Sequence, residues 1–357
     1  MKIGAYSLKP YDVLLVLVPV ALAGSFLGWN ETWLFVLSAL AVIPLAGIMG
    51  TATEELALHM GPRAGGLLNA TLGNAAELII TIFAIQAGLL DLVKASITGS
   101  ILGNVLLVLG LSLLLGGLKN GVQVFDRRQA NVNGTMLVLA VAGLAVPSLF
   151  IASIRNGPES FPTTESLSMA TAVVLILIYV LSIVYSFTLK RGEPQPGAVP
   201  PTHHAAWSVP TALVVLALAT GGIAWLSEIL VGSVEHTVEA LGWSEFFIGV
   251  IIIPLVGNVA EHIVAVQVAL KNKMELSLAV SLGSSLQIAL FVAPLLVFIS
   301  LAMGNPMQLA FNQFEVAALL ASSLIAALIA LDGESNWLEG AMLLVLYAII
   351  GVAFFFL

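Results

Sequence analysis

The 357-residue sequence contains no cysteine and few charged residues. The lack of cysteine excludes disulfide bonds and thiolate metal sites. Charged residues make up 9% of the chain, whereas a soluble domain carries roughly a quarter. Hydrophobic residues make up 59%, and the mean hydropathy is +1.07. This composition excludes a soluble globule. We expect an all-α polytopic membrane protein that is surrounded by the lipid bilayer and has no nucleic-acid partner.

Apolar stretches long enough to cross a bilayer as a helix, about 20 residues each, recur along the whole chain. The first, 11–29, has no convincing small-residue cleavage site, so we interpret it as a spanning helix and not as a signal peptide. We predict about eleven transmembrane helices, with these bounds: 11–29, 33–57, 64–88, 92–116, 133–153, 167–189, 209–230, 245–270, 275–302, 312–331 and 337–357.

Lysine and arginine indicate how these helices are oriented. Of the 12 such residues, two (Lys94 and Arg155) fall on one side of the predicted membrane and the other ten on the opposite side. Cytoplasmic segments carry the excess of positive charge in membrane proteins. We therefore expect a cytoplasmic N-terminus and a C-terminus outside. The lack of a long polar N-terminal extension favours a prokaryotic plasma (inner) membrane over a vacuole.

The sequence GNAAELI at 73–79 returns as GNVAEHI at 257–263, an offset of 184 residues. Five of the seven positions are identical. At the same offset and without a gap, GSILGN at 99–104 aligns with GSSLQI at 283–288. Apolar composition alone explains such an extended match poorly, so we infer an internal duplication.

The duplicated motifs lie on the third and the eighth predicted helices, which must cross the membrane in opposite directions. This is an inverted-topology repeat, the architecture of many secondary transporters, whose sites lie near the midplane where the copies meet. Glu77 and Glu261, one from each motif, should therefore approach each other there. The predicted segments are a first helix in 1–32, a first repeat of five helices in 33–189, a cytoplasmic linker in 190–208 and a second repeat of five helices in 209–357.

Two carboxylates in hydrocarbon cannot both stay ionised without a cation, because burial and mutual repulsion both oppose the charge. The pair either takes up protons or shares a divalent cation. That mutual exclusion is what a cation/proton antiporter requires at its centre. The structural alternative is a pair of protonated carboxyls that only join helices by hydrogen bonds. The symmetry-matched positions argue against that alternative.

The residues around both glutamates favour Ca²⁺, which takes about six to eight oxygen ligands. An amide precedes each glutamate by one turn, serines lie on the partner helices, and a glycine in each motif weakens the helix so that a break can free carbonyl groups. The absence of a Cys or His cluster disfavours Zn²⁺ and Cu⁺, Mg²⁺ fits less well, and Mn²⁺ stays an alternative. The predicted metal ligands are Glu77, Glu261, Asn74, Asn258, Ser100 and Ser284. The residues predicted to line the proton path or to stand behind the ligands are His262, Gln287, Asn104, Gly73 and Gly257.

Several polar and acidic residues also have a structural interpretation. The serines could bond to their own helices, and Gly99 with Gly103 forms a G-x-x-x-G that favours close helix packing. Glu54 and Glu55 at the end of the second helix, and Glu228 at the end of the seventh, lie at opposite membrane faces. They indicate either a cation-attracting vestibule on each side or simply helix ends that are exposed to solvent.

The paired motifs resemble the two α-repeats of the cation/Ca²⁺ exchanger superfamily. GSILGN after the first motif, GSSLQIALFVAP after the second, and DGESNWLEG at 332–340 are most similar to the Ca²⁺/H⁺ antiporters, the CAX family. The resemblance covers nearly the whole chain from about residue 50. It implies ten core helices plus an extra first helix and exchange of Ca²⁺ for H⁺ by alternating access. Glu77 and Glu261 would be the ligands that Ca²⁺ and protons share.

The Na⁺/Ca²⁺ branch is a weaker match, because its second motif helix typically carries an acidic group that 283–290 lacks. Relatives often carry an acidic run between the halves, whereas 190–208 contains only Glu193. A Na⁺-coupled exchanger and, less favoured, a cation channel are the alternative functions. No HExxH, GxSxG or paired-Asp signature occurs in the spans, so we expect neither an enzyme nor a bound cofactor. The sequence is compatible with a homo-oligomer.

Overall fold

The computed structural model describes residues 2–3, 6–7, 9–153, 160–188 and 205–357. The predicted linker 190–208 lies mostly outside the described residues. The elements, in chain order, are β1 (Lys2–Ile3), β2 (Tyr6–Ser7), the 3₁₀ helix η1 (Pro10–Val16), α1 (Leu17–Phe26), α2 (Glu31–Leu72), α3 (Ala75–Gln86), α4 (Leu90–Leu102), the π-helix η2 (Gly103–Val108), α5 (Leu109–Asn120), β3 (Gln123–Val124), α6 (Arg127–Ser153), α7 (Ser160–Thr188), α8 (Val209–Gly232), α9 (Val234–Leu241), α10 (Glu245–Phe247), the π-helix η3 (Ile248–Ile252), α11 (Ile253–Leu270), α12 (Met274–Gln287), the π-helix η4 (Ile288–Val292), α13 (Ala293–Ala302), α14 (Gln313–Asp332), β4 (Glu334–Ser335) and α15 (Trp337–Phe355).

The eleven predicted spans are recovered in this order. Within the described residues, nine helices are long and apolar enough to cross a membrane, and two shorter apolar helices, Pro10–Phe26 and Ala75–Gln86, stand at the first and third predicted spans. The third span, predicted as one helix over 64–88, is in fact two half-helices. The backbone turns at Gly61, where φ is 78°, and the helix ends again at Gly73 before α3 begins.

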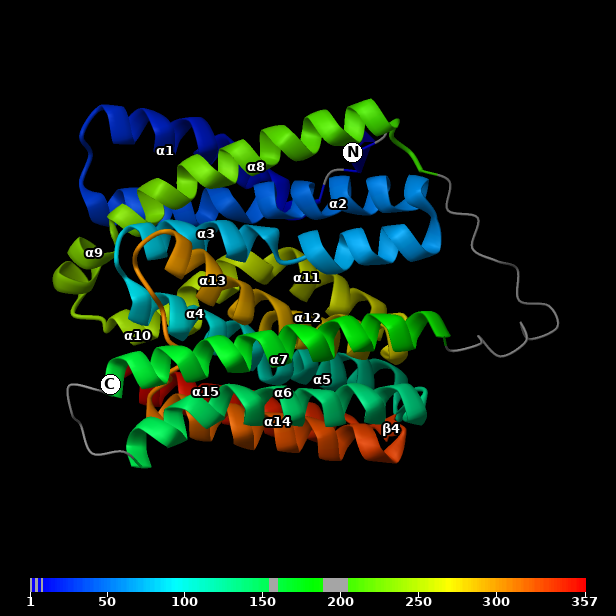
Figure 1. Ribbon diagram of the computed structural model, residues 1–357. Coiled ribbons are helices and arrows are strands. Elements are labelled where there is room, and N and C mark those ends of the chain that lie inside the picture. Colours follow the sequence, from blue (N-terminus) through cyan, green and yellow to red (C-terminus); the bar gives the residue numbers. More distant parts are fainter. Residues whose placement is uncertain (1, 4–5, 8, 154–159, 189–204) are drawn as a thin grey trace.

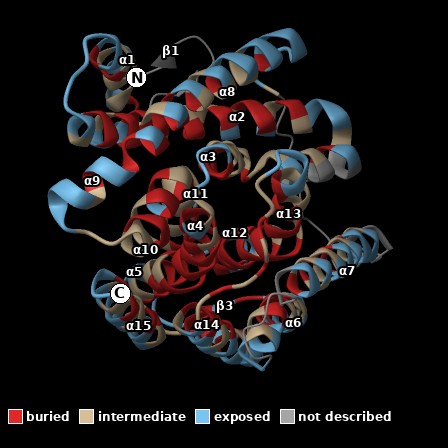
Figure 2. Ribbon diagram, turned by 60° about the vertical axis from the view of Figure 1, so that its left-hand side comes forward, coloured by how far each residue is buried: buried red, intermediate tan, exposed pale blue. Residues whose placement is uncertain are grey.

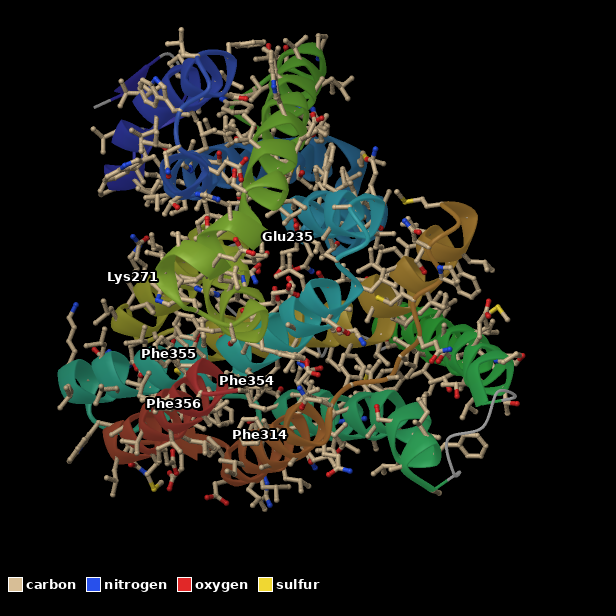
Figure 3. The ribbon with its side chains drawn as sticks, turned by 90° about the vertical axis from the view of Figure 1, so that its left-hand side faces the viewer. Glu235, Lys271, Phe314, Phe354, Phe355 and Phe356 are labelled. Carbon is tan, nitrogen blue, oxygen red and sulfur yellow. The ribbon has the colours of Figure 1, made fainter. Side chains whose placement is uncertain are left out.

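The helices lie side by side in one bundle (Figure 1). α1, α2 and α8 form a layer along one edge, and α6, α14 and α15 lie along the other. One end of the bundle carries Lys119, Arg127, Lys271 and Lys273, and we call it the basic end. At the opposite end, Phe314 and Phe354 pack edge to face with their ring centroids 4.9 Å apart (Figure 3).

The helix contacts follow the predicted two-fold relation between the repeats. The counterparts α2 and α8 pack against each other, as do the counterparts α6 and α14. Contacts between non-equivalent helices occur in matched pairs: α3 packs on α8 as α11 packs on α2, and α5 packs on α15 as α13 packs on α7. The fold is therefore two inverted five-helix repeats plus a first helix, as predicted.

Burial separates the helices that hold the site from those that surround them. α4 is buried along nearly its whole length, and the helices at the centre of the bundle are the most deeply covered (Figure 2). The outer faces of α7 and α15 expose large apolar side chains, among them Leu177 and Val345. A chain that crosses a bilayer presents such surfaces to lipid.

Side-chain caps mark several helix starts. Asn30, Ser208, Asn312 and Asn336 each accept a hydrogen bond from a backbone N–H in the first turn of the helix that follows. These bonds satisfy N–H groups that have no partner inside the helix.

Candidate functional site

Glu77 lies in the first turn of α3, directly after the break at Gly73 and Asn74. Asn74 and Glu77 are both buried, each 3% exposed. The first N–H groups of a helix have no partner inside it, so the helix start favours a negative charge. The break thus places the carboxylate where the backbone partly offsets the cost of its burial.

Residues from both repeats contact the carboxylate of Glu77. Ser100 on α4 donates a hydrogen bond from its hydroxyl to Oε1, and Asn258 on α11 donates a hydrogen bond from its amide to the same oxygen. The other oxygen, Oε2, is buried and has no hydrogen-bond partner among the described residues. One carboxylate oxygen is therefore held in place while the other stays available.

Glu261 has the matching environment in the second repeat. The hydroxyl of Ser284 on α12 donates to its Oε2 at 2.5 Å. This bond and the one between Ser100 and Glu77 join equivalent residues of the two repeats, each pair 23 positions apart. Each of the two glutamates lies beside the motif glycine of the other repeat, Glu77 beside Gly257 and Glu261 beside Gly73.

The glycine of each motif lies beside the glutamate of the opposite repeat. A Cβ atom added to Gly257 would lie 2.9 Å from Cγ of Glu77, and one added to Gly73 would lie 3.8 Å from Oε1 of Glu261. The first distance is too short for a real side chain, so Gly257 is required for the present position of Glu77. The sequence motif contains these glycines, but it does not reveal which atom each one accommodates.

The two halves of the site differ in one bond and in exposure. Asn258 donates to Glu77, whereas its counterpart Asn74 donates to Oε1 of Gln287 at 2.8 Å. The Oδ1 atom of Asn74 is buried and has no partner among the described residues. Glu261 is half-buried, while Glu77 is fully buried. The site is thus less enclosed around the second glutamate.

The prediction that Gly257 breaks its helix as Gly73 does is wrong. α11 runs without interruption through Gly257, and the irregular backbone lies earlier, in η3, just before Pro254. A glycine inside a helix costs only about 1 kcal/mol relative to alanine. Proline lacks an N–H for the carbonyl four residues before it, and η4 likewise stands just before Pro294. The prolines, more than the glycine, were the signal for irregular backbone here.

Two predicted supporting residues are present but are not bonded to the glutamates. Asn104 lies one helical turn after Ser100 and is 1% exposed. Neither its amide oxygen nor its amide nitrogen has a hydrogen-bond partner among the described residues. His262 is half-buried beside Glu261, and its Nε2 atom also has no partner among them.

The predicted vestibule residues lie away from the central pair. Glu54 and Glu228 are exposed on α2 and α8. Glu55 accepts a hydrogen bond from the backbone N–H of Trp207 at 2.9 Å, which ties α2 to the segment before α8. Glu55 therefore has a structural contact of its own, and only Glu54 and Glu228 have carboxylates open to solvent.

Two buried carboxylates, Asp12 and Glu315, were not among the predicted site residues, and Glu315 contacts a central helix of the bundle. Glu315, 1% exposed on α14, accepts a hydrogen bond from the hydroxyl of Thr98 on α4 at 2.9 Å. It also accepts from the backbone N–H of Asn312, as the second half of a capping box. The pattern Asn-x-x-Glu before an apolar run was the available sequence signal. Its partners account for its burial, so it lies outside the site.

The available oxygens decide what the site can bind. The described residues contain no group of three or more His, Cys, Asp or Glu side chains that could hold a metal ion. The site instead combines two carboxylates with amide and hydroxyl oxygens, and two of its buried oxygens, on Asn74 and Glu77, lack a donor among the described residues. Carboxylate, amide and hydroxyl oxygens suit a hard cation such as Ca²⁺.

A Ser284→Ala variant is expected to weaken Ca²⁺ binding by about tenfold, because it removes one hydroxyl oxygen from a site whose cation takes about six to eight oxygen ligands. The matched control is Ser285→Ala, since the neighbouring hydroxyl bonds only to the carbonyl of Ser281 in its own helix. Equilibrium ⁴⁵Ca²⁺ binding to the purified variants measures both. Equal affinities in the two variants would contradict a role for Ser284 at the site.

Comparison with known proteins gives a consistent result. A family model described as sodium/calcium exchanger protein matches residues 30–188 and 211–356. The chain is 46% identical over 364 residues to a Synechocystis sp. protein named Ca(2+)/H(+) antiporter, covering 98% of this chain and 97% of that protein. It is 42% identical over 344 residues to Ca(2+)/H(+) antiporter ChaA of Bacillus subtilis, covering 95% and 97%. The solved structure of native YfkE matches with a TM-score of 0.84 at 40% identity, covering 97% of this chain and all of that one.

Proposed function

The chain belongs to the sodium/calcium exchanger protein family, and we propose that it exchanges Ca²⁺ for H⁺ across its membrane. The observation that carries this proposal is the symmetric pair of glutamates. Glu77 and Glu261 come from opposite repeats, each is hydrogen-bonded by the equivalent serine, and each lies beside the motif glycine of the other repeat. Such a pair is neutralised by a divalent cation or by protons, and binding of one excludes the other.

The groups around the glutamates can serve both states. A hydroxyl donates one hydrogen bond and also offers lone pairs, and an amide has one oxygen and one nitrogen. In the cation-free state Ser100, Ser284 and Asn258 donate to the carboxylates. When Ca²⁺ binds as the transported substrate, rotation of the hydroxyls and of the amide turns their oxygens toward it. The metal ligands would then be Glu77, Glu261, Asn74, Asn258, Ser100 and Ser284.

The two repeats would expose this site to each side of the membrane in turn. Division of the chain into repeats at 33–189 and 209–357 is part of the proposal. The basic end would face the cytoplasm, because cytoplasmic segments carry the excess of Lys and Arg. The curated relatives from Synechocystis and Bacillus subtilis support a bacterial membrane. Mn²⁺, which takes similar oxygen ligands, would be the competing cation.

Uptake of ⁴⁵Ca²⁺ into proteoliposomes after a pH jump tests the function. We expect uptake that needs the pH gradient, stops when a protonophore removes it, and is reduced by excess Mn²⁺. A Na⁺ gradient at clamped pH should drive no uptake. Uptake driven by Na⁺ alone would instead identify a Na⁺-coupled exchanger, and Ca²⁺ flux without any counter-ion would identify a channel.

A further inference from the structure

Buried polar side-chain atoms without a hydrogen-bond partner among the described residues are concentrated in one region. Asn74 and Glu77 belong to the site, and Ser227 lies apart on α8. The remaining residues with such atoms lie on elements that pack together, namely η2, α5, β3, α11 and α12. They are Asn104, Ser112, Gln123, His262, Ser277 and Ser281. Because a buried polar group is costly without a partner, this concentration calls for a common explanation.

The serines on α12 form a line that ends at the site. Ser277, Ser281 and Ser284 are spaced four and three residues apart, which puts them on one face of the helix. Ser284 donates to Glu261, and the other two serines are fully buried. The line therefore runs from the carboxylate of Glu261 toward the basic end, where α12 begins after Lys273.

These hydroxyls do not bond to their own helix, although buried serines elsewhere in the chain do. The hydroxyls of Ser38, Ser285 and Ser322 each donate to the carbonyl four residues earlier. The hydroxyls of Ser277 and Ser281 have no partner among the described residues. Their hydrogen-bonding capacity is thus directed away from the helix backbone.

The spacing along the line fits bridging by water. One helical turn rises about 5.4 Å, and two hydrogen bonds of about 2.8 Å in series span nearly the same distance. A single water molecule between successive hydroxyls would bridge each gap, and buried water commonly satisfies polar groups of this kind.

The facing helices carry small side chains beside the serines. Ala265 and Ala269 follow Glu261 at intervals of four residues on α11, and both are fully buried. On α5, a Cβ atom added to Gly116 would lie 3.3 Å from Cβ of Ala269 and would overlap Oε1 of Gln123. Small residues therefore let α5 and α11 approach each other closely beside the serine line.

The polar residues continue to the basic end. Gln123 is 1% exposed, and its amide donates to the carbonyl of Ala269 at 2.9 Å and to Oδ1 of Asn272 at 3.0 Å. Its own Oε1 has no partner among the described residues. Gln123 thus joins the end of the polar line to the loop that carries Lys271 and Lys273.

The symmetry-related positions of the other repeat lack these polar side chains. With the same offset of 184, the residues that correspond to the polar ones are buried and apolar. Ser277, Ser281, Asn104 and Ser112 correspond to Val93, Ile97, Ile288 and Leu296 respectively. The packing of this fold therefore does not require polar residues there, and the repeat symmetry is broken at these positions.

We propose that Asn104, Ser112, Gln123, Ser277 and Ser281, which we call the polar row, hold a file of water that conducts protons between Glu261 and the basic end. This inference rests on the proposed function and adds a separate proton route to it. When Ca²⁺ binds, the carboxyl of Glu261 gives its proton to the first oxygen of the row. Each water molecule and serine hydroxyl of the file accepts one proton and donates another, while the amides of Asn104 and Gln123 only hold water by hydrogen bonds. Bulk water at the basic end takes up the last proton.

A separate route keeps the departing protons apart from the incoming Ca²⁺. Ca²⁺ entering from the basic end and protons leaving toward it move in opposite directions. If both used one opening, each proton would have to pass the incoming cation against its repulsion. The polar row lets protons leave along α12 while the cation enters elsewhere.

The test compares valine and threonine variants of the same two serines, because these two side chains have the same shape and differ in the hydroxyl. Ser277→Val/Ser281→Val removes both hydroxyls, and valine is what the first repeat carries at the position matching Ser277. Ser277→Thr/Ser281→Thr has the same shape and keeps the hydroxyls. Ser227→Val is the control away from the row, because this serine is also fully buried and without a partner among the described residues.

Stopped-flow mixing of the purified protein with Ca²⁺ and a pH dye gives two readings. The amplitude, the protons released per Ca²⁺ bound, tests the proposed function, and the rate of release tests the polar row. We expect unchanged amplitude in all variants and at least tenfold slower release in the valine pair alone. Release at the wild-type rate in the valine pair, or equal slowing in the threonine pair, would overturn the polar row. An absence of proton release from the wild type would refute the exchange itself.

Discussion

A Glu77→Gln variant is expected to insert and fold like the wild type but to lose Ca²⁺ exchange. Glutamine keeps the shape of the side chain and can still accept from Ser100, so the packing around α3 is preserved. It carries no charge, and a carboxylate about 4 Å from a cation contributes about 4 kcal/mol per unit charge at an effective dielectric constant of 20. For the two charges of Ca²⁺ this is about 8 kcal/mol, a loss of about six orders of magnitude in affinity. Glu261→Gln should have the same effect, because its position in the second repeat is equivalent.

The measurement is pH-driven ⁴⁵Ca²⁺ uptake into proteoliposomes, with protein incorporation checked in the same samples. Glu228→Gln is the matched control, because its carboxylate is exposed on α8 and away from the site. It should reduce uptake only slightly if Glu228 attracts cations to the membrane surface. Near wild-type uptake by either central variant would refute the assignment of the glutamate pair as the exchange site.

A Gly99→Ala variant is expected to destabilise the whole bundle. A Cβ atom at this position would overlap the backbone carbonyl of Val250 in η3, so α4 and η3 could no longer approach as closely. Overpacking of this kind costs about 3 kcal/mol when backbone has to move. The expected result is a lower thermal unfolding temperature in detergent and less protein inserted in the membrane.

Gly103→Ala is the control within the same G-x-x-x-G. A Cβ atom there would have no neighbour within 4 Å, so this variant should unfold at the wild-type temperature. Equal stability of the two variants would show that α4 can shift away from η3 without cost. The sequence pattern treats both glycines alike, whereas the structure predicts that only the first is needed.

Much of this fold could be predicted from the sequence because lipid imposes simple requirements. Each span must be about 20 residues long and apolar, and each backbone polar group must be satisfied inside a helix. The number of spans and the inverted repeat follow from these requirements and from the 184-residue offset. The short third span escaped this reasoning, because the turn at Gly61 and the break at Asn74 lie within a region whose hydropathy stays high.

The site was only partly predictable. The equal spacing between motif and serine in both repeats placed Ser100 and Ser284 among the predicted ligands, but it did not predict their hydrogen bonds to Glu77 and Glu261. Two other bonds depend on how the repeats pack. Asn258 donates to Glu77 across the repeats, whereas its counterpart Asn74 donates to Gln287 and not to Glu261. Such differences between the halves arise from side chains that are not at matched positions, and a comparison of the two motifs does not contain them.

The small ribbon formed by β3 and β4 has a consequence for how the molecule can move. Gln123 lies opposite Ser335 in the ribbon, and the N–H of Phe125 donates to the carbonyl of Gly333. One strand precedes α6 and the other precedes α15, so the ribbon fastens a loop of the first repeat to a loop of the second. The helices on either side of these loops, α5, α6, α14 and α15, are thereby clamped into one body at the basic end. Any hinge that admits an ion there must lie among helices outside this clamp, and α2 and α8, which pack along each other at the far edge, meet that condition.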